Sequence, residues 1–284
     1  MEYDKIKNWK FADVEQTYTE KDSILYALGV GYGCDPMDES ELQFVYEKNL
    51  KAVPTMPVIL GYPGFWMKNP DTGIDWVKIV HGEQALRILK PIPASGTVVG
   101  RSRIKAVIDK GKDKGALVIA ERSIVDKASG AVLATLDHTT FCRGDGGLAQ
   151  SDAAPPPPPA VPDGTPDAVC DLPTLPQAAL IYRLCADPNP LHAEPAVAKA
   201  AGFPRPILHG LATYGVAGHA VLKTFCGYDP AGLAGLAVRF SAPVFPGETV
   251  RTEMWRKGKT VLFRARVMGR DTVVLNNGVA TLAG

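Results

Sequence analysis

The most informative part of the chain is YRLCADPNPLHAEPAVAKAAGFPRPILHGLATYG, residues 182–215. Two prolines in it restrict the residue before each of them to extended geometry, so we expect Asp187 and Asn189 in a rigid, irregular turn. His192 follows five residues after Asp187. A turn of this kind can direct a carboxylate and an imidazole at one point, as is needed to hold a water molecule and transfer its protons. The same pattern is also typical of a turn in which Asp187 caps the next segment and His192 is a surface residue.

The second part of the same sequence is typical of the start of a buried helix. Residues 210–225 are apolar and rich in small side chains, and Gly227 can end the helix. The free N–H groups at such a start, with the positive end of the helix dipole, can stabilise an oxyanion. His209 and Gly210 can equally serve capping and packing alone. An acid/base pair followed by an oxyanion site is what enolate chemistry beside a carbonyl requires, so we favour the chemical interpretation.

A proline-rich segment, residues 151–167, separates two similar halves, residues 1–150 and 168–284. Consecutive prolines are extended and donate no backbone hydrogen bonds, so we interpret the segment as a linker rather than a docking motif. SILYALGVGYG and KPIPASGTV in the first half correspond in order to ALIYRLCADPNP and APVFPGETV in the second. Alternating β-like segments follow in both halves. The sequence therefore predicts an α+β unit with an antiparallel sheet, repeated once, with helices near residues 20–29, 176–184 and 210–225.

Composition excludes several classes of partner and site. The chain has 284 residues and a formal net charge of +1, so nothing indicates a nucleic acid or an anionic membrane surface as partner. It has neither an apolar run long enough to span a membrane nor the apolar core of a signal peptide, and the C-terminal TLAG is not a peroxisomal signal. Five scattered cysteines without C-x-x-C spacing argue against disulfides and structural zinc. We expect a cytoplasmic protein without a metal.

Residues 182–215 resemble the signature of the MaoC-like hydratases, the (R)-specific enoyl-CoA hydratases called hydratase 2. The first half is similar to them through YTEKDSILYALGVG, FVYE, PVILG and KIVHGEQ, in the order seen in the hydratase 2 unit of peroxisomal multifunctional enzyme type 2. The resemblance covers nearly the whole chain. It implies a double hot-dog fold, two antiparallel sheets each wrapped round a helix and joined as a pseudo-dimer. It also implies a homodimer and a lyase that needs no cofactor, because CoA is part of the acyl-CoA substrate.

The resemblance implies that water adds reversibly across a trans-2-enoyl-CoA double bond to give a (3R)-3-hydroxyacyl-CoA. Asp187 and His192 would hold and activate the water, Asn189 would help orient them, and the Gly210 amide would form the oxyanion hole. Aligning LYALGVG with IYRLCAD places Gly31 opposite Asp187, so we expect one active site per chain. The noncatalytic first half would have lost length in its helix, which leaves space for a long or bulky acyl chain.

Other positions match acyl-CoA contacts of the family. The residues assigned to substrate binding in this way are His81, Gly82, His209 and Phe240. A lysine in IDKGKDKG would meet the CoA phosphates, and Lys110 and Lys114 compete for that role. The alternative for these lysines is a solvated turn.

Three positions fit the resemblance less simply. Glu47 in FVYE matches a glutamate important in the family and is expected to have a supporting role, with an ordinary buried ion-pair partner as the alternative. Relatives commonly have glycine before the catalytic aspartate, where this chain has Ala186; alanine would strain a turn with positive φ by about 1 kcal/mol or more. Cys185 suggests a nucleophile, but hydration needs no covalent intermediate, so we interpret it as a small buried side chain.

Two other function classes remain as alternatives. A hot-dog thioesterase would hydrolyse the thioester, whereas the Asp-x-Asn-Pro-x-His arrangement favours hydration. A noncatalytic acyl-CoA-binding protein would suit the first half alone. The intact pair of Asp187 and His192 argues against that role for the whole chain.

Overall fold

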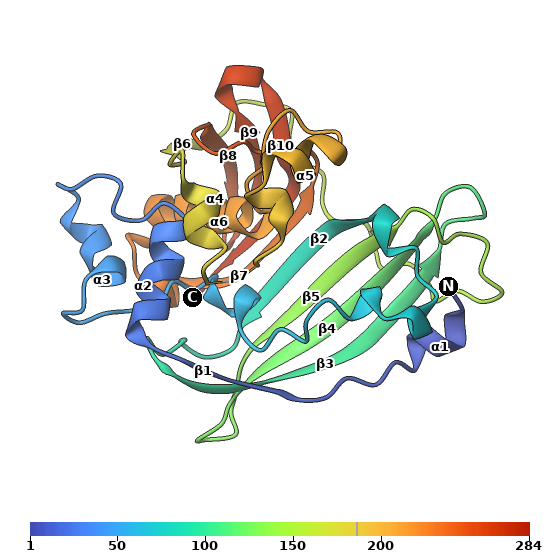
Figure 1. Ribbon diagram of the computed structural model, residues 1–284. Helices are drawn as coiled ribbons and strands as arrows, with labels where there is room; N and C mark the ends of the chain where they lie inside the picture. The colour runs from blue at the N-terminus through green and yellow to red at the C-terminus, as the bar shows by residue number, and fades with distance from the viewer. Residues whose placement is uncertain (186) are drawn as a thin grey trace.

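The computed structural model describes residues 1–185 and 187–284, and its centre is one antiparallel sheet. The strands are β1 (Val14–Tyr18), β2 (Ile79–Ile88), β3 (Gly96–Asp109), β4 (Ala116–Asp126), β5 (Val132–Cys142), β6 (Ala168–Pro173), β7 (Leu233–Phe240), β8 (Thr249–Lys257), β9 (Thr260–Val267) and β10 (Thr272–Leu282). They lie in the order β1-β3-β4-β5-β2-β7-β10-β9-β8-β6 (Figure 1). Buried and partly exposed residues alternate strictly along β9, as expected of a strand with one face on the core.

The two halves of the sheet repeat one topology. The order β1-β3-β4-β5-β2 of the first half matches β6-β8-β9-β10-β7 of the second, strand for strand. The equivalent strands β2 and β7 pair at the centre, with Glu83 opposite Arg239 and Arg87 opposite Gly235. The α+β double hot-dog fold is confirmed, and its two sheets are continuous through the β2–β7 pair (Figure 1).

Six α-helices accompany the strands in the described part of the chain. They are α1 (Tyr3–Lys7), α2 (Glu20–Gly29), α3 (Leu42–Val45), α4 (Ala178–Tyr182), α5 (Pro195–Ala200) and α6 (Gly210–Cys226), and the short 3-10 turns include η2 (Met56–Ile59) and η6 (Pro190–His192). The bounds of α2 are those predicted, α4 is shorter than expected, and α6 extends one residue further before Gly227, whose φ of 54° ends it. No helix among the described residues is long and apolar enough to cross a membrane.

Only the second half surrounds a long helix among the residues that the structure describes. The 17-residue α6 lies against β6, β7, β8 and β10. In the first half the short turn η2 lies against β5, the counterpart of β10. Pro54, Pro57 and Pro63 fall in this segment, and prolines in a helix interior remove hydrogen bonds and clash with the preceding turn. The first half therefore has short turns where the second has its central helix.

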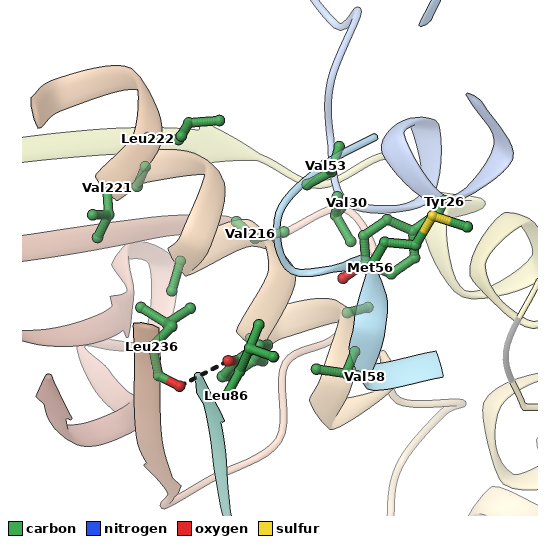
Figure 2. Close-up of a cluster of buried hydrophobic side chains, with 14 of the residues drawn as sticks. Tyr26, Val30, Val53, Met56, Val58, Leu86, Val216, Val221, Leu222 and Leu236 are labelled. Atoms are coloured by element: carbon green, nitrogen blue, oxygen red, sulfur yellow. Dashed lines mark hydrogen bonds between the residues drawn. The ribbon is translucent and has the colours of Figure 1, made fainter. Parts of the chain in front are cut away.

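The core joins the two halves. In Figure 2, Tyr26, Val30 and Met56 of the first half lie beside Val216 of α6, within one cluster of buried side chains. Two glycines of α6 allow this helix to lie directly against residues of the first half. A Cβ on Gly215 would collide with the Val30 side chain, and one on Gly218 would lie 2.6 Å from the Thr55 methyl carbon. The halves are thus packed as one body through α6.

Residues 151–167, all within the described part, form neither helix nor strand. Their start is held on the first half, where the Asp152 carboxylate accepts from Lys7 and from the Val107 N–H, and the later residues contact the second half. The Trp255 indole donates to the carbonyls of Gly164 and Thr165, and the Asn277 side chain donates to that of Pro159. The segment is an extended connection with fixed contacts to β8 and β10.

Candidate active site

The turn that holds the predicted catalytic residues, residues 187–192 and called the catalytic turn below, lies between α4 and α5. It is built from two consecutive side-chain-to-backbone hydrogen bonds. The Asp187 carboxylate accepts from the Asn189 N–H at 2.9 Å, and the Asn189 side-chain oxygen accepts from the Leu191 N–H at 3.1 Å. The second bond caps η6, which ends at His192. Asp and Asn favour such turns, and the alternating prolines keep the backbone out of a regular helix. Asn189 thereby fixes the geometry between the two predicted catalytic residues.

One nitrogen of His192 is bonded to the backbone, and the other has no hydrogen-bond partner among the described residues. His192 is 8% exposed, and its Nδ1 lies 2.9 Å from the Ile207 carbonyl oxygen. A carbonyl can only accept, so Nδ1 carries the proton and Nε2 keeps its lone pair. Burial lowers the pKa of His192, although the Ile207 bond and Asp187 act in the opposite direction. His192 is therefore a neutral base at neutral pH.

His209 holds the turn from the other side. Its Nε2 donates to the Asp187 carbonyl oxygen at 3.0 Å, and its ring stacks on that of His192 with centroids 3.7 Å apart. Burial lowers the pKa of His209 to about 3, so it stays neutral. Side-chain atoms of Asp187, His192 and His209 lie within 4.8 Å of one another. The structure thus brings together the predicted acid/base pair and positions both with His209.

Gly210 is the first residue of α6, directly after His209. The first N–H groups of a helix have no partner within it, and the dipole of this 17-residue helix favours negative charge there. A Cβ at Gly210 would lie 3.3 Å from the Phe240 ring, so glycine allows that ring and a ligand to approach. The start of α6 has the geometry that an oxyanion site requires.

The first half closes the site with two of the predicted binding residues, His81 and Gly82, which lie near Phe240 of the second half. The ring of His81 on β2 lies 4.5 Å from that of Phe240 on β7 and stacks at 3.8 Å on His138 of β5. Gly82 lies at the irregularity in β2–β5 pairing between His81 and Glu83. Burial lowers the pKa of His81 to about 4, so this wall of the site is neutral. His81 therefore lies beside Phe240, whose ring in turn lies next to Gly210.

The two halves of the chain match two family descriptions. Residues 16–144 match the MFE-2 hydratase 2 N-terminal domain, and residues 159–277 match the MaoC-like domain. A protein of Dictyostelium discoideum named probable enoyl-CoA hydratase 2 is 39% identical over 98% of this chain and 95% of its own length. The chain belongs to the MaoC-like hydratase 2 family.

Further relatives of this hydratase 2 chain agree in sequence and structure. The 3-hydroxyacyl-thioester dehydratase Y of Mycobacterium tuberculosis is 39% identical and is covered over 91% of its length, with 92% of this chain. The crystal structure of a MaoC-like dehydratase from Phytophthora capsici superimposes with a TM-score of 0.86 at 37% identity, over 99% of this chain and 98% of the other. Together these matches span both halves.

Tyr62 and Arg122 reach the site although sequence reasoning did not select them. The Arg122 guanidinium lies 5.6 Å from the centre of the Tyr62 ring. Burial raises the pKa of Tyr62, and the nearby Asp187 carboxylate raises it further. The signal was present in β4, where Arg122 interrupts an otherwise apolar series of inward residues, Val118, Ala120 and Ile124. An arginine in such a series indicates a functional or structural partner.

The remaining hydratase 2 assignments lie away from the catalytic turn. Lys110 and Lys114 are exposed on the β3–β4 hairpin, whose Lys110 N–H bonds to Gly115 O and whose Lys114 N–H bonds to Gly111 O. Either lysine can meet a phosphate there, and the choice between them stays a prediction. The position of Ala186, and with it the expected strain, lies outside the described residues.

The buried glutamate of the first half is Glu41 rather than Glu47. Glu47 is exposed after α3, whereas Glu41 is 3% exposed. Glu41 accepts from the Tyr228 hydroxyl at 2.7 Å and the Gly33 N–H at 2.6 Å, and lies 3.1 Å from His219 Nε2 on α6. Desolvation acts to raise its pKa, but these hydrogen bonds hold it at about 2. A buried hydrogen-bonded cluster around Glu41 thus ties the first half to α6.

Cys185 is placed as a packing residue. Its thiol donates to the Tyr182 carbonyl at 3.2 Å, and burial raises its pKa to about 12. A thiol held protonated is a poor nucleophile. Cys185 is only partly buried rather than buried as expected, but it packs against the core cluster as a small filling side chain.

Proposed function

We propose that the protein catalyses the (R)-specific hydration of trans-2-enoyl-CoA to (3R)-3-hydroxyacyl-CoA, together with the reverse dehydration. The observation that carries the proposal is the neutral His192 with its free Nε2, held beside Asp187 at the start of α6. The names of the relatives, a hydratase and a dehydratase, describe the two directions of one equilibrium. The protein is a hydro-lyase of acyl-CoA metabolism.

Each group of the site has one role in the addition of water to the double bond. The thioester oxygen accepts from the Gly210 N–H, which stabilises negative charge as it develops there. A water held by Asp187 and His192 Nε2 attacks C3, and its O–C3 bond forms while the C2=C3 electron pair moves towards the thioester. His192 takes one proton from the water, and the acid/base pair then gives a proton to C2 as the enolate collapses, which returns the pair to its initial state.

The experiment that tests this proposal follows the loss of enoyl-thioester absorbance when the protein meets trans-2-enoyl-CoAs of several lengths. Absorbance loss without release of free CoA supports hydration. Release of free CoA would instead make the protein a thioesterase, and tight acyl-CoA binding without turnover would make it a binding protein. The length profile also measures the space available to the acyl chain.

We also propose that the chain is a cytoplasmic homodimer. All five cysteines are free thiols, which suits a reducing compartment. β6 ends the sheet with Val169 48% exposed, and an open edge of this kind can meet a second copy. Light scattering of the purified protein tests the dimer. Imaging of a tagged chain tests the compartment, because a relative in Arabidopsis thaliana is named as peroxisomal.

A further inference from the structure

Residues from both halves lie next to one another in a ring-shaped series that starts at Gly210 and returns to the catalytic turn. From Gly210 the series passes to Phe240, then to His81 at 4.5 Å between ring centres, and then to His138 stacked at 3.8 Å. His138 lies on β5 of the first half, the half with the short turn η2 in place of a long helix. The series therefore leads from the oxyanion site onto the inner face of the first-half sheet.

The series returns to the catalytic turn through Arg122 and Tyr62. His138 pairs with Ala120 of β4, so Arg122, two residues further along, is on the same face of the sheet as His138. The Arg122 guanidinium lies 5.6 Å from the Tyr62 ring, and Tyr62 lies near enough to Asp187 to feel its charge. An acyl chain that extended from a thioester at Gly210 into the first half would pass along this face.

Arg122 is a partly buried cation without a counter-ion among the described residues. Seven other arginines lie within 4.0 Å of a carboxylate, namely Arg101, Arg103, Arg239, Arg251, Arg264, Arg266 and Arg270. Arg122 instead donates one Nη2 hydrogen bond to the Val58 carbonyl at 2.7 Å, and its Nε is buried without a partner. Burial lowers its pKa to about 10, so it stays charged at neutral pH. A cation that is partly accessible and has no carboxylate partner can accept a ligand of opposite charge.

We propose that Arg122 binds a carboxylate at the far end of the acyl chain, so that the preferred substrates are ω-carboxylated enoyl-CoA thioesters. This inference rests on the proposed function, because it assumes that the thioester lies at Gly210. The guanidinium presents a fork of donors that fits a carboxylate, and it is fixed by Val58 and Tyr62 before the ligand arrives. A fixed cation at a fixed distance from Gly210 selects one chain length as well as one charge.

Binding of saturated CoA thioesters tests this inference without requiring turnover. Calorimetry compares plain acyl-CoA, ω-carboxyacyl-CoA and its ω-methyl ester in a series of chain lengths. We expect the carboxylate to bind about tenfold more tightly than the equally long methyl ester at one optimal length. We expect Arg122→Gln to abolish this difference. Arg103→Gln, a change at an exposed arginine paired with Glu121 on the neighbouring strand, is the matched control and keeps the difference.

Equal affinity of the wild-type protein for carboxylate and methyl ester at every length would overturn the inference, and so would a preference that survives in a folded Arg122→Gln protein. The wild-type comparison decides the matter alone if Arg122→Gln does not fold. Failure of the proposed function would look different, because then no enoyl-CoA, carboxylated or plain, would be hydrated.

Discussion

The imidazole of His209 stacks on that of His192 at 3.7 Å while its Nε2 holds the Asp187 backbone, so one residue positions both members of the acid/base pair. Both rings are neutral because burial lowers their pKa values. A charged His209 beside His192 would also repel the proton that His192 has to accept. The stack therefore keeps His192 available as a base.

This arrangement predicts an activity that persists in mild acid. The base form of His192 is lost only below the ordinary pKa of a histidine, because burial has moved its pKa downwards. We expect kcat/KM to stay constant as the pH falls from 8 to about 6.5 and to decline only below it. Hydration rates across this range check the prediction. A decline centred at or above pH 6.5 would show that His192 is not the base.

Removal of either member of the pair should abolish most of the hydration. We expect Asp187→Asn and His192→Ala to lower kcat by about 10²- to 10⁴-fold, because each eliminates a group that handles the proton of the water. Asp163→Asn, in the linker, is the control and keeps the wild-type rate. Circular dichroism shows whether the variants fold. Near-wild-type turnover in either folded variant would remove that residue from the mechanism.

Cys185→Ser should leave hydration largely intact. The thiol is protonated and bonded to the Tyr182 carbonyl, a bond that a serine hydroxyl can replace. Steady-state kinetics and a thermal melt of the variant check this expectation. Complete loss of activity in a folded Cys185→Ser protein would revive a covalent mechanism.

Chelation should not change the rate. Asp187, His192 and His209 are close enough to hold a divalent ion, and three protein ligands with an open position are typical of catalytic zinc. The proposed reaction, however, uses the carboxylate and His192 Nε2 on water directly. We expect equal turnover before and after prolonged treatment with EDTA. A loss that added zinc restores would place a metal in the mechanism.

The contact between the halves predicts a stability effect at Gly215. A Cβ there meets Val30, so Gly215→Ala should lower the free energy of unfolding by about 1–3 kcal/mol in spite of the higher helix propensity of alanine. Gly269→Ala, where nothing lies within 4 Å of the added carbon, is the matched control. Denaturant titration compares the two. Equal stability of both variants would contradict the close packing of α6 on the first half.

The local features of the fold could be predicted from the sequence because they depend on neighbouring residues. Alternation in β9, the Gly227 end of α6 and the turn from Asp187 to His192 all result from residues within a few positions of one another. The bounds of α4 were predicted less well, because the point at which the chain leaves this helix does not depend on helix propensity alone.

The contacts between the halves could not be predicted in this way. Glu41 and His219 are 178 positions apart, and they meet only because the sheets join through β2 and β7. Tyr62 and Arg122 lie in the same half but 60 positions apart, and they meet because an irregular segment of the chain lies near β4. Neither pair has a spacing that a local pattern can reveal. The position of Arg122 in the otherwise apolar inward series of β4 indicates that it has a partner, but it does not identify that partner.

The most direct test of the central claim is chiral analysis of the product formed from a trans-2-enoyl-CoA by the wild-type protein and by Asp187→Asn. The account predicts (3R)-3-hydroxyacyl-CoA from the wild-type protein and at least about a hundredfold less of it from the variant. A (3S) product, or the same yield of (3R) product from a folded Asp187→Asn protein, would contradict it.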